Sequence, residues 1–231
     1  MEPHIERLLQ KEDLSIIISL PDNKEELAQA AIEAGADALK FHIYAHHHAT
    51  GNKFKGPEHY EHLFKQVRQD FAGPIGVVIG DDIDQVRTVS TQVLKNYGFN
   101  YFSLYGKDVD STILQQNDLA KTVAVDYQFN PHHVKAIESL GVDAVELSIV
   151  RKEDYGKSLD FLDIVTYQTY RDHTSLPLIV PSQKKLIPED LITFREIGIN
   201  AVMLGAVTIG NTADSIYETV LAFRKQKETI A

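Results

Sequence analysis

The chain has 231 residues, of which 43% are hydrophobic and 24% charged, a composition typical of a globular protein that buries a substantial core. Its net charge of −10 argues against binding to nucleic acid or to an anionic membrane surface. Cysteine is absent, which excludes disulfides, thiolate catalysis and cysteine metal sites. The charged N-terminus lacks the apolar region of a signal peptide, and no run approaches the roughly 18 apolar residues of a membrane helix, so we expect a cytoplasmic protein.

Eight strand-like segments alternate with helical patterns along the chain. Four are simple apolar runs: LSIIISL (14–20), GPIGVVIG (73–80), LAKTVAVDY (119–127) and LPLIVPS (176–182). The other four end a repeated pattern, in which a helical segment is followed by Gly, one residue, Asp or Asn, and an alternating run. These copies are AIEAGADALKFHIY (31–44), LKNYGFNYFSLY (94–105), AIESLGVDAVELSIV (136–150) and FREIGINAVMLGAV (194–207). We expect their glycines to end the helices in the left-handed conformation.

Alternating strands and helices predict a parallel sheet covered by helices. Eight units in this length are close to the usual size of a closed (β/α)8 barrel. The main alternative is an open doubly wound sheet, but SLPDNKEEL after the first strand has no glycine fingerprint. We therefore predict an α/β fold, a single (β/α)8 (TIM) barrel domain over residues 1–231.

Polar side chains alternate with apolar ones in the even-numbered strands. Lys40, His42 and Tyr44 are expected to point into the barrel, and so is Glu146 from the strand on the opposite side. A buried lysine requires a partner, and Glu146 is the best candidate for Lys40. The pair is either a structural ion pair or a lysine and carboxylate poised for proton transfer or Schiff-base chemistry, with His42 nearby. A register shifted by one residue would turn both groups outward.

The last strand leads into a glycine turn followed by a helix that begins near Thr212 or Ala213. In barrels of this kind, the loops after strands 7 and 8 frequently bind phosphate through backbone N–H groups. Gly205 and Ala206 would provide such groups, and Ser182, Gln183 and Lys184 after strand 7 could add donors. The alternative is a glycine turn without a ligand.

This region resembles the phosphate-binding (β/α)8 superfamily, which includes tryptophan-biosynthesis barrels, thiamine-phosphate synthase and N-acetylmannosamine-6-phosphate epimerase. The similarity covers the final third best, in PEDLITFREIGINAVMLGA and in the segment LGAVT (204–208), which is similar to the GGAIT of the epimerases. It implies phosphate binding around Ser182, Gly205 and Ala206. At the end of the seventh strand this sequence has Pro-Ser-Gln-Lys-Lys, where the epimerases have an acidic residue and glycine. No particular member of the superfamily is therefore identified.

Three consecutive histidines follow the second strand, in a loop expected at the mouth of the barrel. His42 with one of His46, His47 or His48 could bind a divalent metal, although consecutive residues of an extended segment point to opposite sides. His46 and His48 could instead bind substrate, or the segment could be a solvated polar loop.

Together these features predict an enzyme that acts on a small phosphorylated metabolite as an isomerase, an epimerase or an aldolase-like lyase. A metal-assisted hydrolase and a non-catalytic phosphate-ester-binding barrel are the alternatives. No cofactor is expected apart from the possible divalent metal, and a homodimer is a base-rate expectation.

Overall fold

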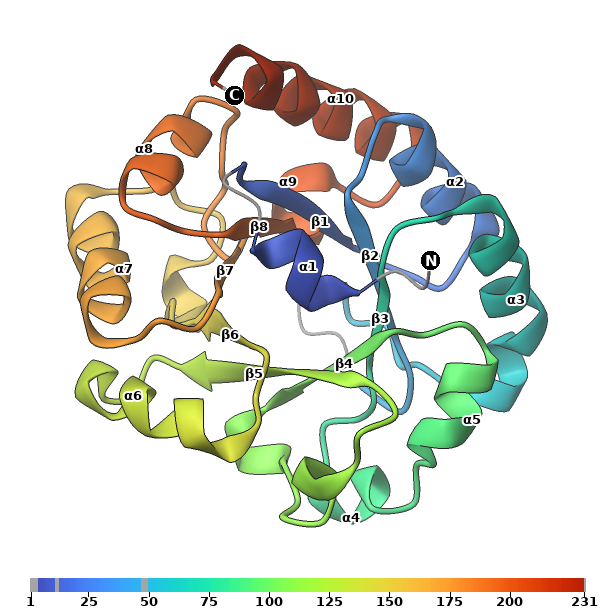
Figure 1. The fold of residues 1–231 in the computed structure, drawn as a ribbon. Helices are drawn as coiled ribbons and strands as arrows, with labels where there is room; N and C mark the ends of the chain where they lie inside the picture. The colour runs from blue at the N-terminus through green and yellow to red at the C-terminus, as the bar shows by residue number, and fades with distance from the viewer. Residues whose placement is uncertain (1–3, 11–12, 47–49, 231) are drawn as a thin grey trace.

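The computed structural model describes residues 4–10, 13–46 and 50–230. Eight parallel strands form a closed barrel, in which each strand pairs with the next and β8 pairs with β1 (Figure 1). The strands are β1 Ser15–Ser19, β2 Ala38–His42, β3 Ile75–Val78, β4 Tyr101–Tyr105, β5 Ala120–Asp126, β6 Ala144–Ser148, β7 Leu178–Pro181 and β8 Ala201–Leu204. The predicted barrel is confirmed, and every strand lies within its expected segment.

Helices surround the ring of strands (Figure 1). The α-helices are α1 Ile5–Leu9, α2 Glu25–Glu33, α3 Glu61–Asp70, α4 Ile83–Val86, α5 Thr91–Asn96, α6 Val134–Ile137, α7 Phe161–His173, α8 Asp190–Glu196, α9 Ala206–Ile209 and α10 Ala213–Ile230. Short 3-10 turns are η1 Pro57–Tyr60, η2 Gly106–Asp108, η3 Ile113–Gln115, η4 Pro131–His133, η5 Glu138–Leu140 and η6 Lys152–Asp154. The chain between β3 and β4 forms two separate helices, of which Asp82 caps α4 and Ser90 caps α5.

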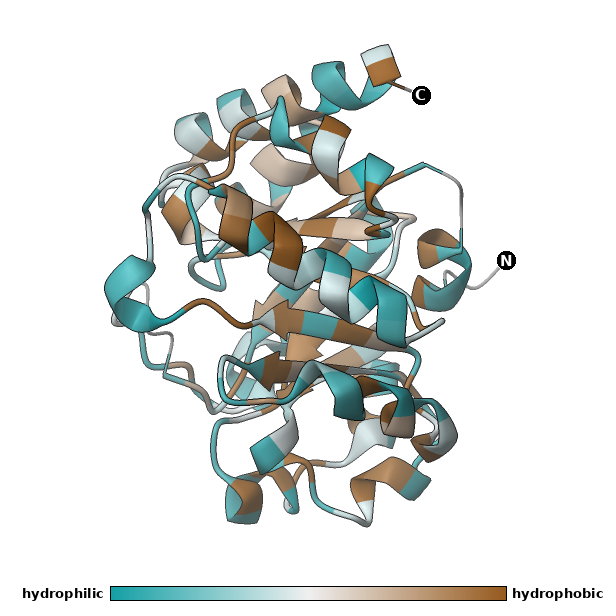
Figure 2. Ribbon diagram, turned by 90° about the vertical axis from the view of Figure 1, so that its left-hand side faces the viewer, coloured by the Kyte–Doolittle hydropathy of each residue, from teal (hydrophilic) through white to brown (hydrophobic). Residues whose placement is uncertain are grey.

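Two apolar layers hold the barrel together. The larger lies between strands and helices and includes Leu39 and Phe41, whose ring makes an edge contact with Phe64 of α3 at 5.2 Å. The smaller fills the barrel, where Ile17 and Tyr101 pack against α1. Helix α1 thus closes the end of the barrel that faces the viewer in Figure 1. Figure 2 shows brown, hydrophobic segments along the central strands and teal segments on the outer turns.

The Gly-x-Asp/Asn pattern has a structural role at the end of the barrel that α1 closes. Each of its glycines has a positive φ, between 70° and 98°, as the helix-ending role requires. Each Asp or Asn side chain accepts a hydrogen bond from the start of the preceding strand. The four bonds are Ile16 N to Asp37 at 2.8 Å, Ile75 N to Asn100 at 2.9 Å, Lys121 N to Asp143 at 2.7 Å and Leu178 N to Asn200 at 2.8 Å. The repeat therefore ties the strands together in pairs.

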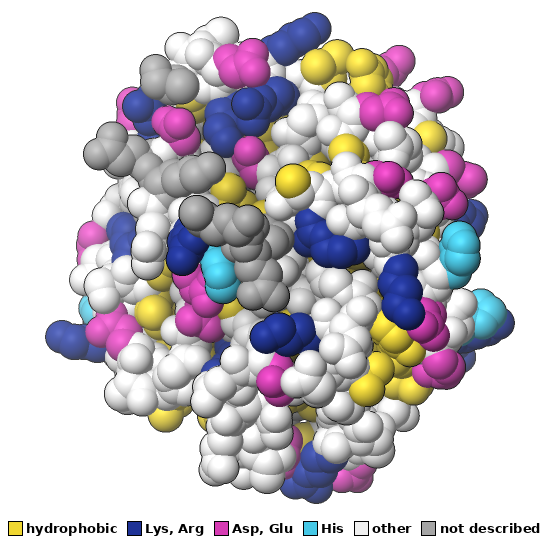
Figure 3. Space-filling view, turned by 45° about the vertical axis from the view of Figure 1, so that its right-hand side comes forward, with side chains coloured by type: hydrophobic (Ala, Val, Ile, Leu, Met, Phe, Trp, Pro, Cys, Tyr) yellow, Lys and Arg dark blue, Asp and Glu magenta, His cyan; other side chains and the backbone are white. Residues whose placement is uncertain are grey.

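The surface carries both signs of charge. On the face in Figure 3, Lys and Arg side chains are interspersed with Asp and Glu. In the part of the chain that the structure describes, no helix is long and apolar enough to cross a membrane.

Candidate active site at the carboxyl ends of the strands

A cavity of about 370 Å³ opens at the carboxyl ends of the strands, and all eight strands or the residues directly after them contribute to its wall. Because parallel strands all end on this side, side chains from distant parts of the chain meet here. Of the residues singled out from the sequence, the wall includes Lys40, His42, His46, Glu146, Ser182, Gln183, Gly205 and Ala206.

The floor of the cavity holds the Lys40–Glu146 ion pair. Lys40 Nζ lies 3.0 Å from Glu146 Oε2, and the two residues are only 5% and 2% exposed. The expected strand register is therefore confirmed. Thr122 donates to the other carboxylate oxygen at 2.7 Å. Burial by itself would raise the pKa of Glu146, but the Lys40 ammonium and the hydroxyls of Ser103 and Thr122 overcome it, and they hold this pKa below its usual value.

The hydrogen bonds around Glu146 determine which groups are available for chemistry. Its carboxylate already accepts from an ammonium and two hydroxyls, so it is poorly placed to remove a proton from a substrate. An ammonium has three donors, and Lys40 lines the cavity, so it can donate to a bound molecule while it stays paired. The ion pair with Glu146 fixes the position of the Lys40 ammonium at the cavity floor.

His42 lies at the end of β2 with its ring stacked on Phe54, at 5.0 Å between centroids and 19° between planes. Asn23 holds its backbone, donating to the His42 carbonyl at 2.6 Å and accepting from its N–H at 3.3 Å. The chain then leaves the strand at Tyr44, whose φ is 52°. The Tyr44 hydroxyl donates to Glu58 at 3.4 Å, and the residue is not part of the cavity wall, so the expectation that it points into the barrel is wrong.

The loop after β2 doubles back on itself. His46 forms an antiparallel bridge with Lys53, and its N–H donates to Asp81 at 2.9 Å. This places the exposed His46 at the rim of the cavity. His48 lies outside the described residues. Within 4–10, 13–46 and 50–230, no group of three or more potential metal-binding side chains comes together.

Sequence reasoning missed one acidic group in the cavity wall, Asp108 after β4. It is 7% exposed, and its nearest cation is Lys107 at 3.7 Å. Burial, helped by the nearby Asp81 and Asp82, raises the pKa of Asp108 despite this lysine. A buried carboxyl of this kind is suited to take up or release a proton. Its only sequence signal is its position, three residues after a strand end.

Strands β7 and β8 form the opposite wall. Ser182 Oγ accepts a hydrogen bond from Gly205 N at 2.8 Å, so the Gly205 N–H is already engaged. Gln183 accepts from Val150 N at 3.0 Å and donates to the Tyr155 hydroxyl at 2.6 Å, and these two bonds orient its side chain. Ala206 lines the cavity at the start of α9, where the first N–H groups of a helix have no partner within the helix.

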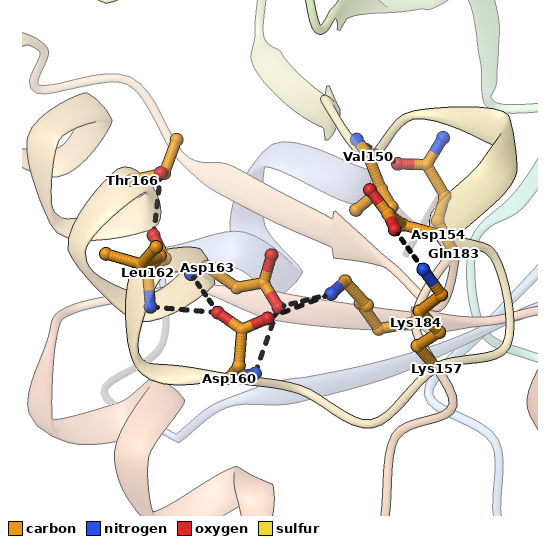
Figure 4. Close-up of polar contacts among 9 residues, drawn as sticks. All are labelled: Val150, Asp154, Lys157, Asp160, Leu162, Asp163, Thr166, Gln183 and Lys184. Atoms are coloured by element: carbon orange, nitrogen blue, oxygen red, sulfur yellow. Dashed lines mark hydrogen bonds and ion pairs between the residues drawn. The ribbon is translucent and has the colours of Figure 1, made fainter.

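Lys184 does not belong to this wall, and the expectation that it binds substrate is corrected. Its side chain points toward the start of α7, where Nζ lies 2.8 Å from Asp163 and 3.3 Å from Asp160 (Figure 4). The residue is 5% exposed, and a buried ammonium requires such countercharges. Asp160 and Asp163 also form the capping box of α7, so Lys184 compensates the negative charge of the two capping carboxylates.

Replacing Lys184 with methionine tests this placement. We expect the free energy of unfolding to fall by about 2 kcal/mol, because charge-assisted hydrogen bonds are lost. Phosphate affinity should stay within about twofold of the original, since the ammonium lies outside the cavity. Urea unfolding and calorimetric titration with inorganic phosphate measure the two quantities. A large loss of phosphate affinity with unchanged stability would return Lys184 to the binding site.

The closed ring of eight parallel strands with its cavity at the strand ends defines a (β/α)8 TIM barrel. No family model matches the chain, and no curated protein sequence matches it. Solved structures with the same fold include thiamine phosphate pyrophosphorylase from Pyrococcus furiosus, at 12% identity and a TM-score of 0.68, covering 96% of this chain and 98% of that one. A tryptophan synthase complex of the same organism is 16% identical with a TM-score of 0.71, covering 92% and 98%. Phosphoribosyl anthranilate isomerase from Thermus thermophilus is 14% identical with a TM-score of 0.67, covering 94% and 100%. At these low sequence identities, the structural similarity shows that the fold is shared and nothing further.

Proposed function

We propose that this protein is an enzyme that acts on a small phosphorylated metabolite, as an isomerase or lyase that works next to a carbonyl group. The observation that carries the proposal is the Lys40 ammonium, buried and ion-paired with Glu146 at the floor of a cavity large enough for a small ligand. A fixed cation in a site shielded from water stabilises negative charge that develops on a substrate oxygen. Glu146 holds Lys40 in place for this task.

Proton transfer needs a second group in the same cavity. His42 and Asp108 both line it, from β2 and from the turn after β4. In the proposed reaction, one of them takes the proton from the carbon beside the carbonyl while Lys40 donates to the carbonyl oxygen. The Lys40 amine donates to Glu146 in this arrangement, which favours its role as a hydrogen-bond donor over Schiff-base formation.

The β7 and β8 wall is the proposed site of the phosphate group. Ser182 accepts from Gly205 and retains its own hydroxyl proton for a ligand, and the backbone at the start of α9 supplies further donors. The named activities of the thiamine and anthranilate neighbours involve phosphate-containing compounds, which supports this assignment. The location in the cytoplasm, the homodimer and the absence of nucleic-acid partners stay predictions of the sequence.

Replacing Ser182 with alanine tests the phosphate site. Losing one hydroxyl donor should weaken binding of inorganic phosphate by about fivefold to tenfold, which corresponds to roughly one hydrogen bond. Phosphorus NMR or calorimetric titration at constant ionic strength measures the affinity. The Lys184→Met variant is the matched control, since it removes a charge from the same segment outside the cavity. No phosphate binding by the unmodified protein, or equal binding by the alanine variant, would contradict the assignment.

A further inference from the structure

The four copies of the Gly-x-Asp/Asn pattern differ in one respect. In three of them, an arginine from a neighbouring helix donates to the Asp or Asn side chain, and its methylene groups pack over the glycine. These bonds are Arg224 of α10 to Asp37 at 3.3 Å, Arg68 of α3 to Asn100 at 3.1 Å and Arg171 of α7 to Asn200 at 3.3 Å. The packing joins Arg224 to Gly35, Arg68 to Gly98 and Arg171 to Gly198. Each guanidinium therefore covers one of the Asp or Asn side chains that bond to the preceding strand.

The third copy, Gly141 and Asp143, has no such cover. Asp143 accepts from Lys121 N, but no arginine among the described residues donates to it. A Cβ placed on Gly141 would meet nothing within 4 Å. The reason lies in the chain between β4 and β5. The three arginines come from α3, α7 and α10, whereas the segment in the corresponding place forms only η2 and η3.

The uncovered side chain lies in a cavity of about 380 Å³, at the opposite end of the barrel from the proposed active site. The ionisable residues in its wall are His4, Glu6, Lys95, Asp118, Lys121 and Asp143. The carboxylates outnumber the lysines, so the wall favours a cation. Lys121 Nζ donates to Asn117 at 3.4 Å, so the hydrogen bond from Lys121 to Asp143 comes from its backbone N–H.

Two further observations point to a missing donor. Burial raises the pKa of Asp143, as expected for a half-buried carboxyl whose charge is incompletely compensated. Glu6 Oε2 is a buried oxygen without a hydrogen-bond partner among the described residues, and the His4 ring nitrogen Nδ1 lies 3.8 Å from it. Glu6 and Asp143 both line this cavity.

We propose that this cavity binds a guanidinium group, in the place that an arginine of the chain itself occupies in the other three copies. A guanidinium presents several donors in one plane and is more weakly hydrated than an ammonium, so it suits a half-buried carboxylate. The group could belong to a free arginine-like metabolite or to an arginine in a peptide segment. The recognised chemistry is the same in both cases.

Titration with methylguanidinium, followed by NMR of the backbone amides, tests the proposal. We expect saturable shifts at Lys121 and Asp143, a lowered pKa of Asp143 in the bound state, and weaker binding of methylammonium at equal concentration. The Asp143→Asn variant should bind about fivefold more weakly, since a charge-assisted hydrogen bond becomes a neutral one. It should fold normally, because Asn100 and Asn200 tie their strands with the same amide. Asp70→Asn, on the exposed end of α3, is the matched control.

Comparing free arginine with a Gly-Arg-Gly peptide separates the two sources, since tighter binding of one identifies the form that the cavity accepts. Absence of saturable shifts would overturn the proposal. Equal binding by the unmodified protein and by both Asn variants would overturn it as well, because the shifts would then reflect a general effect of salt. None of these readouts depends on catalytic activity, so the outcome is independent of the proposed function.

Discussion

Replacing Lys40 with methionine is expected to lower the free energy of unfolding by about 3 to 5 kcal/mol, the typical cost of removing one partner from a buried ion pair. Glu146, only 2% exposed, would keep its hydroxyl donors but lose its countercharge. If the proposed function is right, the variant also loses turnover, because the cation at the floor of the cavity is gone. Urea unfolding measures the first effect, and single-turnover assays measure the second.

The pH dependence of stability separates this effect from a simple packing defect. In the original protein the pKa of Glu146 is lower in the folded state than in the unfolded state. Its contribution to stability is therefore fully present above the unfolded pKa, and it is lost as the pH falls from that pKa through the lower, folded one. In the methionine variant burial dominates and should raise this pKa. The contribution of Glu146 to the free energy of unfolding should then become unfavourable as the pH rises above its unfolded pKa, which is the opposite of its contribution in the original protein. An unchanged pH profile would contradict the account of the pair.

The double variant Lys40→Met/Glu146→Gln provides the control. A neutral amide can still accept from Thr122 and does not need a countercharge, so most of the lost stability should return. Under the proposed function, turnover should stay lost in the double variant, since Lys40 is the group proposed to donate to the substrate. Recovery of turnover together with stability would remove Lys40 from the proposed mechanism.

Replacing Gly76 with alanine is expected to cost about 3 kcal/mol, at the upper end of the usual range for an overpacked core. Gly76 of β3 lies in register with Tyr101 of β4, and a Cβ at this position would overlap the Tyr101 ring. The ring has little freedom to move, because it is fully buried against α1 and its hydroxyl donates to the Leu39 carbonyl at 3.2 Å. Thermal and urea unfolding measure the loss.

Two further variants make the Gly76 prediction specific. Tyr101→Leu in the Gly76→Ala background removes the overlapping atoms and should restore part of the stability, so the two changes are coupled. Gly106→Ala is the matched control, because a Cβ there would meet its nearest neighbour at 3.7 Å, an ordinary contact. Equal destabilisation by both alanine substitutions would indicate a general effect of replacing glycine and would contradict the packing explanation.

The sequence predicted the site as far as local rules reach. The placement of Lys40, His42 and Glu146 in the interior follows from the alternation of side chains along a strand, and the cavity wall confirms it. The same rule failed at Tyr44, where the backbone leaves the extended conformation. The prediction for Lys184 was wrong for a different reason, because the direction of its side chain depends on two aspartates more than twenty residues earlier in the chain. Asp108 was missed because nothing in its immediate sequence marks it as buried.

By itself, then, the sequence determined the order of elements, the closed barrel and the inward-facing polar residues of the even strands. These features depend on backbone conformation and on the period of two, which neighbouring residues set. Only the tertiary structure decided which oxygen each buried cation reaches, how Ser182 engages Gly205, and why one copy of the repeat lacks its arginine. Such pairings are made between segments that are far apart in the chain, and burial selects them because an unpaired charge or donor in the interior is costly.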